Sequence, residues 1–179
     1  LVLIGALNVL SDPRKGTDLV LKALTHLAAG SDTPDALLVF GQSAVAGQLN
    51  LPAPTHFLGR LHDDISLVLA YSAADVFVVP SRQDNLPNTA VESLACGTPV
   101  VAFDIGGLPD MVTHRENGWL ARPFDTEDLA QGIAWVLNNE HRRATLSLMA
   151  RRTAEAQFDE AVVAEKYRTL YNKILERNV

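Results

Sequence analysis

The stretch VFVVPSRQDNLPNTAVESLACGTPVVAF, from Val76 to Phe103, decides the fold of this chain. It begins with β-branched and aromatic residues up to Pro80, which predicts a buried strand. A polar loop, a segment compatible with a short helix, and a second apolar run from Val100 to Phe103 follow. The order strand, loop, helix, strand is typical of a right-handed unit in a parallel sheet. Such a unit places the first loop and the amino end of the helix together at the carboxyl edge of the strands.

Two acidic residues, Asp84 and Glu92, lie in this unit. If the helix begins near Asn88 or Thr89, Glu92 lies about one turn into it, where its carboxylate can accept two hydrogen bonds from the diol of a ribose. The amides of the first helical turn have no partners within the helix, so they offer a site for a diphosphate. The segment therefore suits a nucleotide-sugar. An ordinary capped core helix with two solvated acids is the alternative, and the residues alone leave both open.

Composition indicates one folded domain with a proper core, since the 179 residues are 47% apolar and 20% charged. The net charge of −6 argues against a nucleic-acid partner. The sequence contains no apolar run of membrane-spanning length and no signal-peptide pattern. A single cysteine excludes an intrachain disulfide and is consistent with a reducing compartment. The abrupt apolar start at Leu1, without a methionine, leads us to expect a fragment of a longer protein.

Short apolar runs alternate with segments of helical periodicity along the rest of the chain, which predicts an α/β fold with a doubly wound parallel sheet flanked by helices. A helix capped by Asp63 or Asp64 is expected to bury Ile65, Val68, Leu69 and Ala73. A carboxyl-terminal helix is expected to have the apolar stripe Val163, Tyr167, Leu170, Tyr171 and Ile174.

Three further features bear on a site. Lys15 follows the first predicted strand in a loop that contains Gly16, so it is either an ordinary solvated lysine or a cation at the carboxyl edge of the sheet. Gly106 and Gly107 either let the backbone approach a ligand closely or only form a turn. The histidines are scattered without ligand spacing, so no metal site is expected. They are His26, His56, His62, His114 and His141.

Several short motifs follow one another in a specific order and spacing. They are Lys15-Gly16, Pro80-Ser81, Asp84 with Glu92, Ala95-Cys96-Gly97, Pro99-Val100-Val101, Gly106-Gly107-Leu108-Pro109 and Asn117-Gly118. Together they resemble the carboxyl-terminal half of a GT-B glycosyltransferase of the large retaining family 4, or glycosyl transferases group 1, type. The resemblance covers essentially the whole chain. It implies a single Rossmann-like domain, residues 1–179, that binds a nucleotide-sugar donor.

The resemblance also implies roles for individual residues. Glu92 would bind the ribose hydroxyls, Asp84 would contact hydroxyls of the transferred sugar, and Lys15 would offset charge on the departing diphosphate. Arg60 and Leu61 would lie near the base. The diphosphate and sugar would lie along the backbone of Asn85, Leu86, Pro87, Asn88 and Thr89.

This sequence departs from the family pattern at two positions. Asp84 stands where the family usually has glutamate, which is one methylene longer. Ala6 stands where the family usually has an arginine at the end of the first strand. Arg14, next to Lys15, is the candidate to replace that arginine.

We therefore expect a glycosyltransferase donor domain that uses a UDP-sugar or GDP-sugar, with retention at the anomeric carbon and without a metal or other cofactor. The acceptor would be held by an amino-terminal domain outside this chain, so the fragment would be inactive alone. We expect a cytoplasmic location, with membrane association only through the full-length protein. Two alternatives stay open: a catalytically degenerate nucleotide-sugar-binding subunit, and a nucleotide-sugar epimerase, whose acid and base residues are not apparent here.

Overall fold

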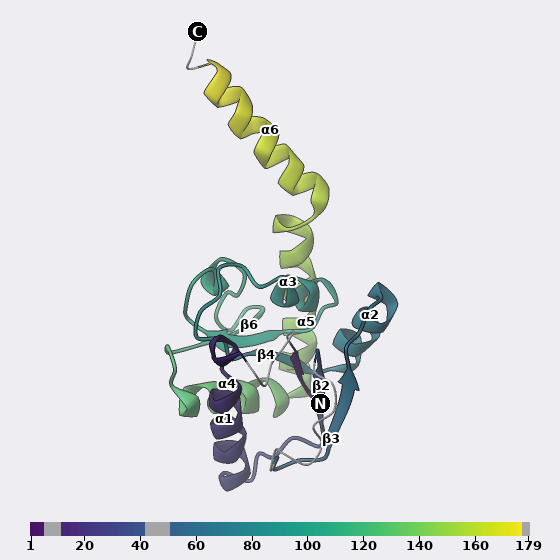
Figure 1. Cartoon of the computed structure of the whole chain (residues 1–179), viewed down its shortest axis with the longest axis vertical. Coiled ribbons are helices and arrows are strands. Elements are labelled where there is room, and N and C mark those ends of the chain that lie inside the picture. Colours follow the sequence, from purple (N-terminus) through teal and green to yellow (C-terminus); the bar gives the residue numbers. More distant parts are fainter. Residues whose placement is uncertain (6–11, 42–50, 177–179) are drawn as a thin grey trace.

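A computed structural model describes residues 1–5, 12–41 and 51–176 of the chain, and the structural statements below concern these residues. Strands and helices alternate through most of the chain (Figure 1). The strands are β1 (Val2–Gly5), β2 (Leu37–Phe40), β3 (Thr55–Gly59), β4 (Val76–Val79), β5 (Val100–Phe103) and β6 (Gly118–Ala121). The α-helices are α1 (Thr17–Ala29), α2 (Asp64–Ala73), α3 (Asn88–Ala95), α4 (Thr126–Leu137), α5 (Glu140–Gln157) and α6 (Glu160–Glu176), and two short 3-10 helices are η1 (Pro13–Lys15) and η2 (Leu108–Asp110).

The strands form one six-stranded parallel sheet in the order β3-β2-β1-β4-β5-β6. This confirms the predicted doubly wound α/β fold. The chain first builds outward from β1 to β3 and then returns to the other side of β1 to place β4. The strand order therefore reverses between β1 and β4, and in such sheets ligands bind at the carboxyl ends of the strands beside this switch point.

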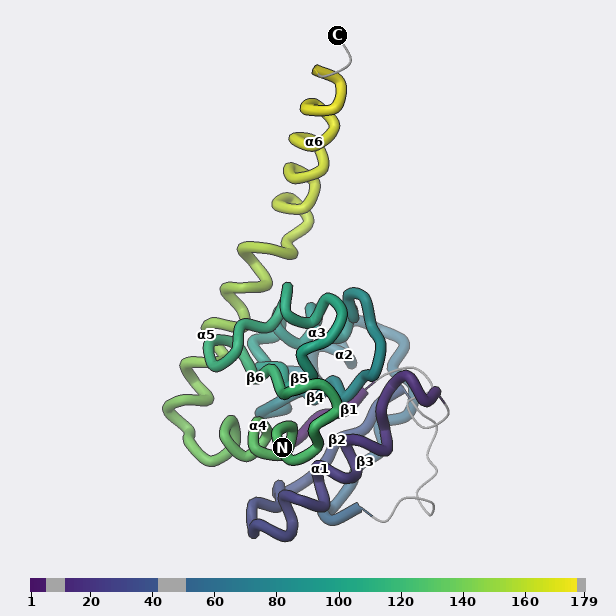
Figure 2. The backbone as a smooth tube through the Cα atoms, turned by 90° about the vertical axis from the view of Figure 1, so that its left-hand side faces the viewer, coloured from purple at the N-terminus to yellow at the C-terminus, as the bar shows by residue number. Residues whose placement is uncertain are grey.

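Both faces of the sheet are covered, as a parallel sheet requires. Helices α1 and α4 pack side by side on one face, where Leu24 and Ile133 are fully buried (Figure 2). Helices α2, α3 and α5 cover the other face around Tyr71, Phe77 and Leu94. The four residues of β4 and the four of β5 are all buried, as their continuous apolar runs predict.

The predicted inward face of α2 is wrong. Ile65, Val68 and Leu69 are 74%, 50% and 64% exposed, and the buried residues of this helix are Ala70 and Tyr71. The N-cap prediction is confirmed, because the carboxylate of Asp63 accepts a hydrogen bond from the amide of Ser66 at 2.8 Å.

Helix α6 extends away from the body of the domain (Figures 1 and 2). It contains no buried residue, so the predicted apolar stripe exists but faces outward. Its large members, Tyr167, Leu170, Tyr171 and Ile174, are 47% to 59% exposed. Among the described residues, no helix is both long and apolar enough to cross a membrane.

Candidate functional site

The segments that follow β1 and β4 meet at the switch point of the sheet. Lys15 ends η1, after β1, and Asp84 lies in the loop after β4. Their side chains form an ion pair with 3.1 Å between Lys15 Nζ and Asp84 Oδ2, and these side chains are only 29% and 17% exposed. Parallel neighbouring strands end at the same edge of the sheet, so the topology brings together two groups that are 69 positions apart.

The backbone around Lys15 is fixed by its neighbours. The carboxylate of Asp12 accepts a hydrogen bond from the amide of Arg14 at 3.0 Å, and Pro13 lies at the start of η1. Gly16 then takes a φ of +65°, and a Cβ at this position would lie 1.8 Å from the carbonyl oxygen of Pro80. Only glycine allows such an approach, so Gly16 lets the loop after β1 lie directly against the end of β4.

The two segments enclose a hollow of about 390 Å³. This volume is within the range, roughly 300–1,000 Å³, of pockets that hold small molecules. The residues that line it are Arg14, Lys15, Gln83, Asp84, Asn85 and Leu86. The structure thus brings five of the predicted site residues to one pocket.

Arg14 borders this pocket but its guanidinium binds Asp12, with 2.7 Å between Nη2 and Oδ2. The hydrogen bond to this carboxylate raises the pKa of Arg14. Lys15, and not Arg14, is therefore the cation that faces Asp84. Ala6, where the family usually has an arginine, lies outside the described residues.

A larger hollow of about 640 Å³ lies between α2, the carboxyl end of α3 and α5. Its lining includes Val68, Cys96 and Leu148, and its one charged residue is Arg151. It is at the far end of α3 from Asn88. We place the candidate site at the smaller hollow, because opposite charges and a helix amino terminus converge there.

Helix α3 begins at Asn88, as predicted, directly after the pocket-lining segment. Pro87 precedes it, and no side chain caps this end of the helix. Asn88 is exposed and Thr89 is half-buried. The partial positive charge of the helix end therefore lies beside the Lys15 and Asp84 loops.

Glu92 lies one turn into α3, on an exposed position. Its carboxylate accepts a hydrogen bond at 2.9 Å from the hydroxyl of Tyr71, which is 1% exposed and packs edge-to-face on Phe40 and Phe77. Burial, and after it the charge of Glu92, raises the pKa of Tyr71 far above its ordinary value. The hydroxyl thus stays protonated and holds one carboxylate oxygen in place.

Tyr71 was missed from the sequence because α2 was assigned the wrong inward face. A tyrosine directly after the apolar run from Leu67 to Ala70 was the available signal, since a buried tyrosine usually has a polar partner for its hydroxyl.

The two glycines Gly106 and Gly107 do permit a close approach, but to the backbone of this chain. A Cβ at Gly106 would lie 1.9 Å from the carbonyl oxygen of Asp84, and one at Gly107 would lie 1.7 Å from that of Asn85. Gly106 also has a φ of +54°, which other residues rarely adopt. The loop after β5 therefore supports the loop that contains Asp84.

Arg60 and Leu61 follow β3, which is an edge strand of the sheet. Arg60 is exposed, while Leu61 is half-buried against the core beneath α2. Neither residue lines the pocket. In the described part of the chain, no three His, Cys, Asp or Glu side chains lie close enough together to hold a metal ion.

Comparisons with known proteins relate the chain to one family. The family described as "Glycosyl transferases group 1" matches residues 8–153. The chain is 46% identical over 136 residues to a D-inositol 3-phosphate glycosyltransferase of Saccharomonospora viridis, which is 76% of this chain and 30% of that protein.

Solved structures of similar fold cover nearly all of the chain. Sucrose-phosphate synthase of Thermosynechococcus elongatus superposes with a TM-score of 0.76 at 27% identity, over 98% of this chain and 46% of that one. Alr3699/HepE of Anabaena, in complex with UDP and glucose, superposes with a TM-score of 0.74 at 25% identity, over 95% and 48%. The chain spans less than half the length of each of these proteins.

Proposed function

The chain belongs to the glycosyl transferases group 1 family, and from this premise we propose that it is the donor-binding domain of a glycosyltransferase. The site at the switch point binds a UDP-sugar or GDP-sugar, and the glycosyl group is transferred with retention at the anomeric carbon. The observation that supports this most is the pairing of Lys15 with Asp84 beside an uncapped helix amino terminus. A cation and helix amides suit a diphosphate, and a carboxylate suits sugar hydroxyls.

In this proposal, ligand binding replaces the ion pair. Lys15 turns from Asp84 to the diphosphate and stabilises the negative charge that develops as the diphosphate leaves. Asp84, freed from Lys15, accepts hydrogen bonds from hydroxyls of the transferred sugar. The backbone from Asn85 to Thr89 lies along the diphosphate and sugar. Arg14 adds positive charge at the rim of the pocket.

Glu92 binds the ribose in this proposal. Tyr71 already occupies one of its carboxylate oxygens, so the orientation of the carboxylate is set before the nucleotide arrives. Arg60 and Leu61 lie near the base. The donor site uses no metal, because Lys15 and the end of α3 supply the positive charge.

The acceptor belongs to another domain of a longer protein. Two observations support this part of the proposal: the chain spans less than half of each of these relatives, and the apolar side chains of α6 are not buried by the part of the chain that the structure describes. HepE, whose structure holds UDP and glucose, supports a nucleotide-sugar as the donor. We propose a cytoplasmic location, with any contact to a membrane surface made through the longer protein.

Titration calorimetry with UDP and GDP tests the donor site. We expect the chain to bind at least one of them, and Glu92→Ala to weaken that binding about tenfold or more, since hydrogen bonds to a charged group contribute about 1.5–3 kcal/mol. Glu116→Ala, at an exposed turn position, is the matched control and should bind as the wild type does. Absence of binding to both nucleotides, or equal binding by Glu92→Ala, would contradict the proposal.

Sugar transfer by the longer protein separates an enzyme from a non-catalytic nucleotide-sugar-binding subunit. We expect transfer, and its loss in Lys15→Ala but not in Lys22→Ala, which removes an exposed lysine of α1. A protein that binds the nucleotide and transfers no sugar would instead be the non-catalytic subunit.

A further inference from the structure

Two ion pairs connect the same two segments of the proposed donor site, and the segment that supplies the cation in one pair supplies the anion in the other. In the first, the cation Lys15 belongs to the segment after β1 and the anion Asp84 to the loop after β4. In the second, the anion Asp18 lies in the first turn of α1 and the cation Arg82 lies in the loop after β4. Arg82 binds Asp18 in a two-pronged arrangement, with 2.6 Å from Nη1 to Oδ1 and 2.6 Å from Nη2 to Oδ2.

Arg82 also binds the backbone directly before Lys15. Its Nη1 donates a hydrogen bond to the carbonyl oxygen of Pro13 at 3.0 Å, and its own amide donates to the carbonyl oxygen of Arg14 at 2.7 Å. On the other side of Lys15, Gly16 packs against Pro80. Arg82, which lies two residues before Asp84, thus holds the chain before Lys15 through Pro13 and Arg14 and after Lys15 through Asp18.

The two ion pairs differ in what happens to them when a ligand binds. The proposed function requires Lys15 to turn to the diphosphate and Asp84 to turn to the sugar, so the contact between them is lost. The pair of Arg82 and Asp18 does not line the pocket and can stay intact. It then still connects the two segments.

We propose that Arg82, held by Asp18, is a positioning residue of the donor site. It keeps the backbone of Lys15 opposite the Asp84 loop when Lys15 and Asp84 leave their ion pair and bind the ligand. The inference rests on the proposed function, because it needs Lys15 to contact the nucleotide.

Removal of the Arg82 side chain should weaken ligand binding more than it lowers the stability of the fold. The side chains of Arg82 and Asp18 are 37% and 54% exposed, and exposed ion pairs add little to the stability of a fold. The planar guanidinium matches the carboxylate with two parallel hydrogen bonds, so it restricts the relative orientation of the two segments. A small displacement of a positioned group can cost much more in binding and catalysis than in folding.

A double-mutant cycle between Arg82 and Lys15 tests the inference. UDP and GDP are titrated into the wild type, Arg82→Ala, Lys15→Ala and the double variant, and the melting temperature of each is recorded. Arg82→Ala should weaken the affinity for the nucleotide that binds by about tenfold, on the scale expected for a misplaced group. With Lys15→Ala already present, Arg82→Ala should change the affinity less than about twofold, because the two residues are coupled through the backbone that Arg82 holds, and the effects of coupled residues are not additive. Arg82→Lys, which keeps the charge but not the planar fork, should recover part of the affinity.

Arg151→Ala is the matched control. Arg151 also binds a carboxylate, that of Glu155 at 2.6 Å, and a carbonyl oxygen on another element, that of Ala95, but it lies on α5 at the far end of α3. Its removal should leave nucleotide affinity unchanged. If Arg82→Ala does not fold, Asp18→Asn provides the same cycle, since it removes the charge of the partner without changing its shape.

The outcomes are distinct. An equal loss of affinity with and without Lys15 would show that Arg82 supports the structure in general, and would overturn the inference. Unchanged affinity in Arg82→Ala would overturn it as well, while the proposed function would stand. A wild type that binds neither UDP nor GDP would remove the proposed function and the inference together, and this result is visible before any variant is made.

Discussion

Gly107 shows how a residue without a side chain determines the position of the candidate site. Its φ of −93° suits any residue, so backbone conformation does not require glycine there. Glycine is required for lack of space, because a Cβ would lie 1.7 Å from the carbonyl oxygen of Asn85. This oxygen belongs to the backbone and cannot move aside as a flexible side chain could. Any side chain at this position must therefore displace the loop that contains Asp84.

We predict that Gly107→Ala lowers the free energy of unfolding by about 1–3 kcal/mol, the usual effect of overpacking. It should also weaken nucleotide binding, because Asp84 and Asn85 move relative to Lys15. Urea unfolding and calorimetry measure the two effects. Gly30→Ala is the control, since φ is −85° there and the nearest atom to a Cβ would be 3.6 Å away. Equal stability of the two variants would contradict this explanation of Gly107.

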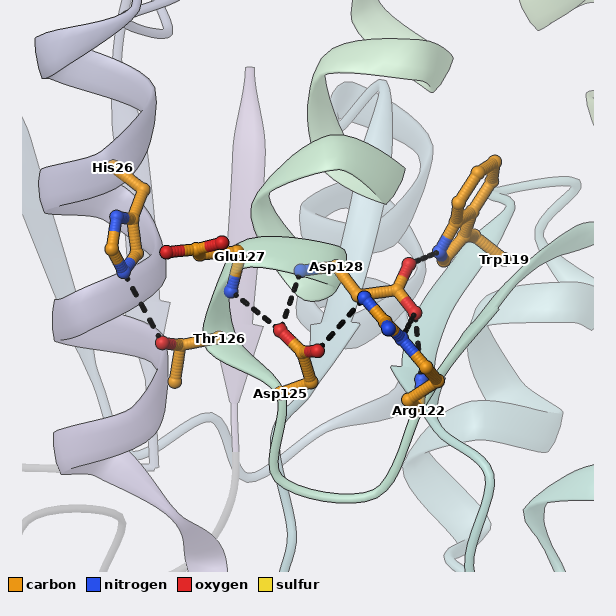
Figure 3. Close-up of polar contacts among 7 residues, drawn as sticks. All are labelled: His26, Trp119, Arg122, Asp125, Thr126, Glu127 and Asp128. Carbon is orange, nitrogen blue, oxygen red and sulfur yellow. Dashed lines mark hydrogen bonds and ion pairs between the residues drawn. The ribbon is translucent and has the colours of Figure 1, made fainter.

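The pKa of Asp128 is determined by the residues that hydrogen-bond to its carboxylate (Figure 3). It is 9% exposed, and its carboxylate accepts hydrogen bonds from Trp119 Nε1 at 3.0 Å and from the amide and Nε of Arg122 at 2.9 and 3.0 Å. Burial alone would raise the pKa of Asp128, but the hydrogen bonds from Arg122 and Trp119 outweigh it and lower the pKa below the ordinary value. These bonds fix the turn from β6 into α4.

A pKa that is lower in the folded state than in the unfolded state stabilises the fold only while the carboxylate is charged. The contribution of Asp128 should therefore be complete above the ordinary aspartate pKa, about 4, and should be lost as the pH falls through the lower folded value. We predict that wild type exceeds Asp128→Asn in stability at pH 6 and that this difference shrinks below pH 4. Urea unfolding across this range measures it. A difference that does not change with pH would show that the charge of Asp128 contributes nothing.

At the scale of elements, agreement among local signals decided which predictions were right. The segment from β4 through α3 to β5 was predicted closely, because the apolar runs, Pro87 before the helix and Gly97 after it all indicate the same boundaries. Helix α2 has two apolar stripes instead. Ile65, Val68 and Leu69 form one, while Leu67, Ala70 and Tyr71 form the other and face the core. Periodicity cannot choose between two stripes of similar hydrophobicity, so the inward face of α2 could not be read from the sequence.

The last two helices differ in what they bury. Leu146 of α5 is 1% exposed and belongs to the core, whereas Leu170 of α6 is 50% exposed. We predict that Leu146→Ala costs about 2–5 kcal/mol of stability, and that Leu170→Ala changes it by less than about 0.5 kcal/mol. Thermal or urea unfolding of this chain measures both variants, and each is the control for the other. A large loss in Leu170→Ala would mean that α6 packs on the domain in solution.

For the whole molecule, the strand order explains why part of the site was predictable. Lys15 and Asp84 follow strands that turned out to be neighbours at the switch point, and a doubly wound sheet places such loops together. The contacts of Tyr71 with Glu92 and of Arg82 with Asp18 were not predictable in this way. They depend on the orientation of α2 about its own axis and on the path of the loop after β4 along the start of α1. The tyrosine in α2 indicates a polar partner for its hydroxyl but not which residue that partner is, and the sequence carries no periodic signal for the contact between Arg82 and Asp18.

The exposed apolar residues of α6 lead to a prediction about a longer protein. A helix that buries no residue has little besides its own hydrogen bonds to keep it formed, so its amides should exchange rapidly in this chain. If the acceptor domain covers the stripe of Tyr167, Leu170 and Tyr171, the same amides should exchange at least about tenfold more slowly in the longer protein, because apolar burial opposes opening.

Hydrogen exchange followed by mass spectrometry on both proteins measures this difference, with α1, whose buried face lies within this domain, as the internal control. Leu170→Lys should remove the extra protection in the longer protein, because a charge cannot be buried there without a partner. The same change should leave nucleotide binding by this chain unaltered, since α6 does not line the candidate pocket. Equal exchange of α6 in the two proteins would contradict an acceptor domain seated on this helix and would require another partner for its apolar face.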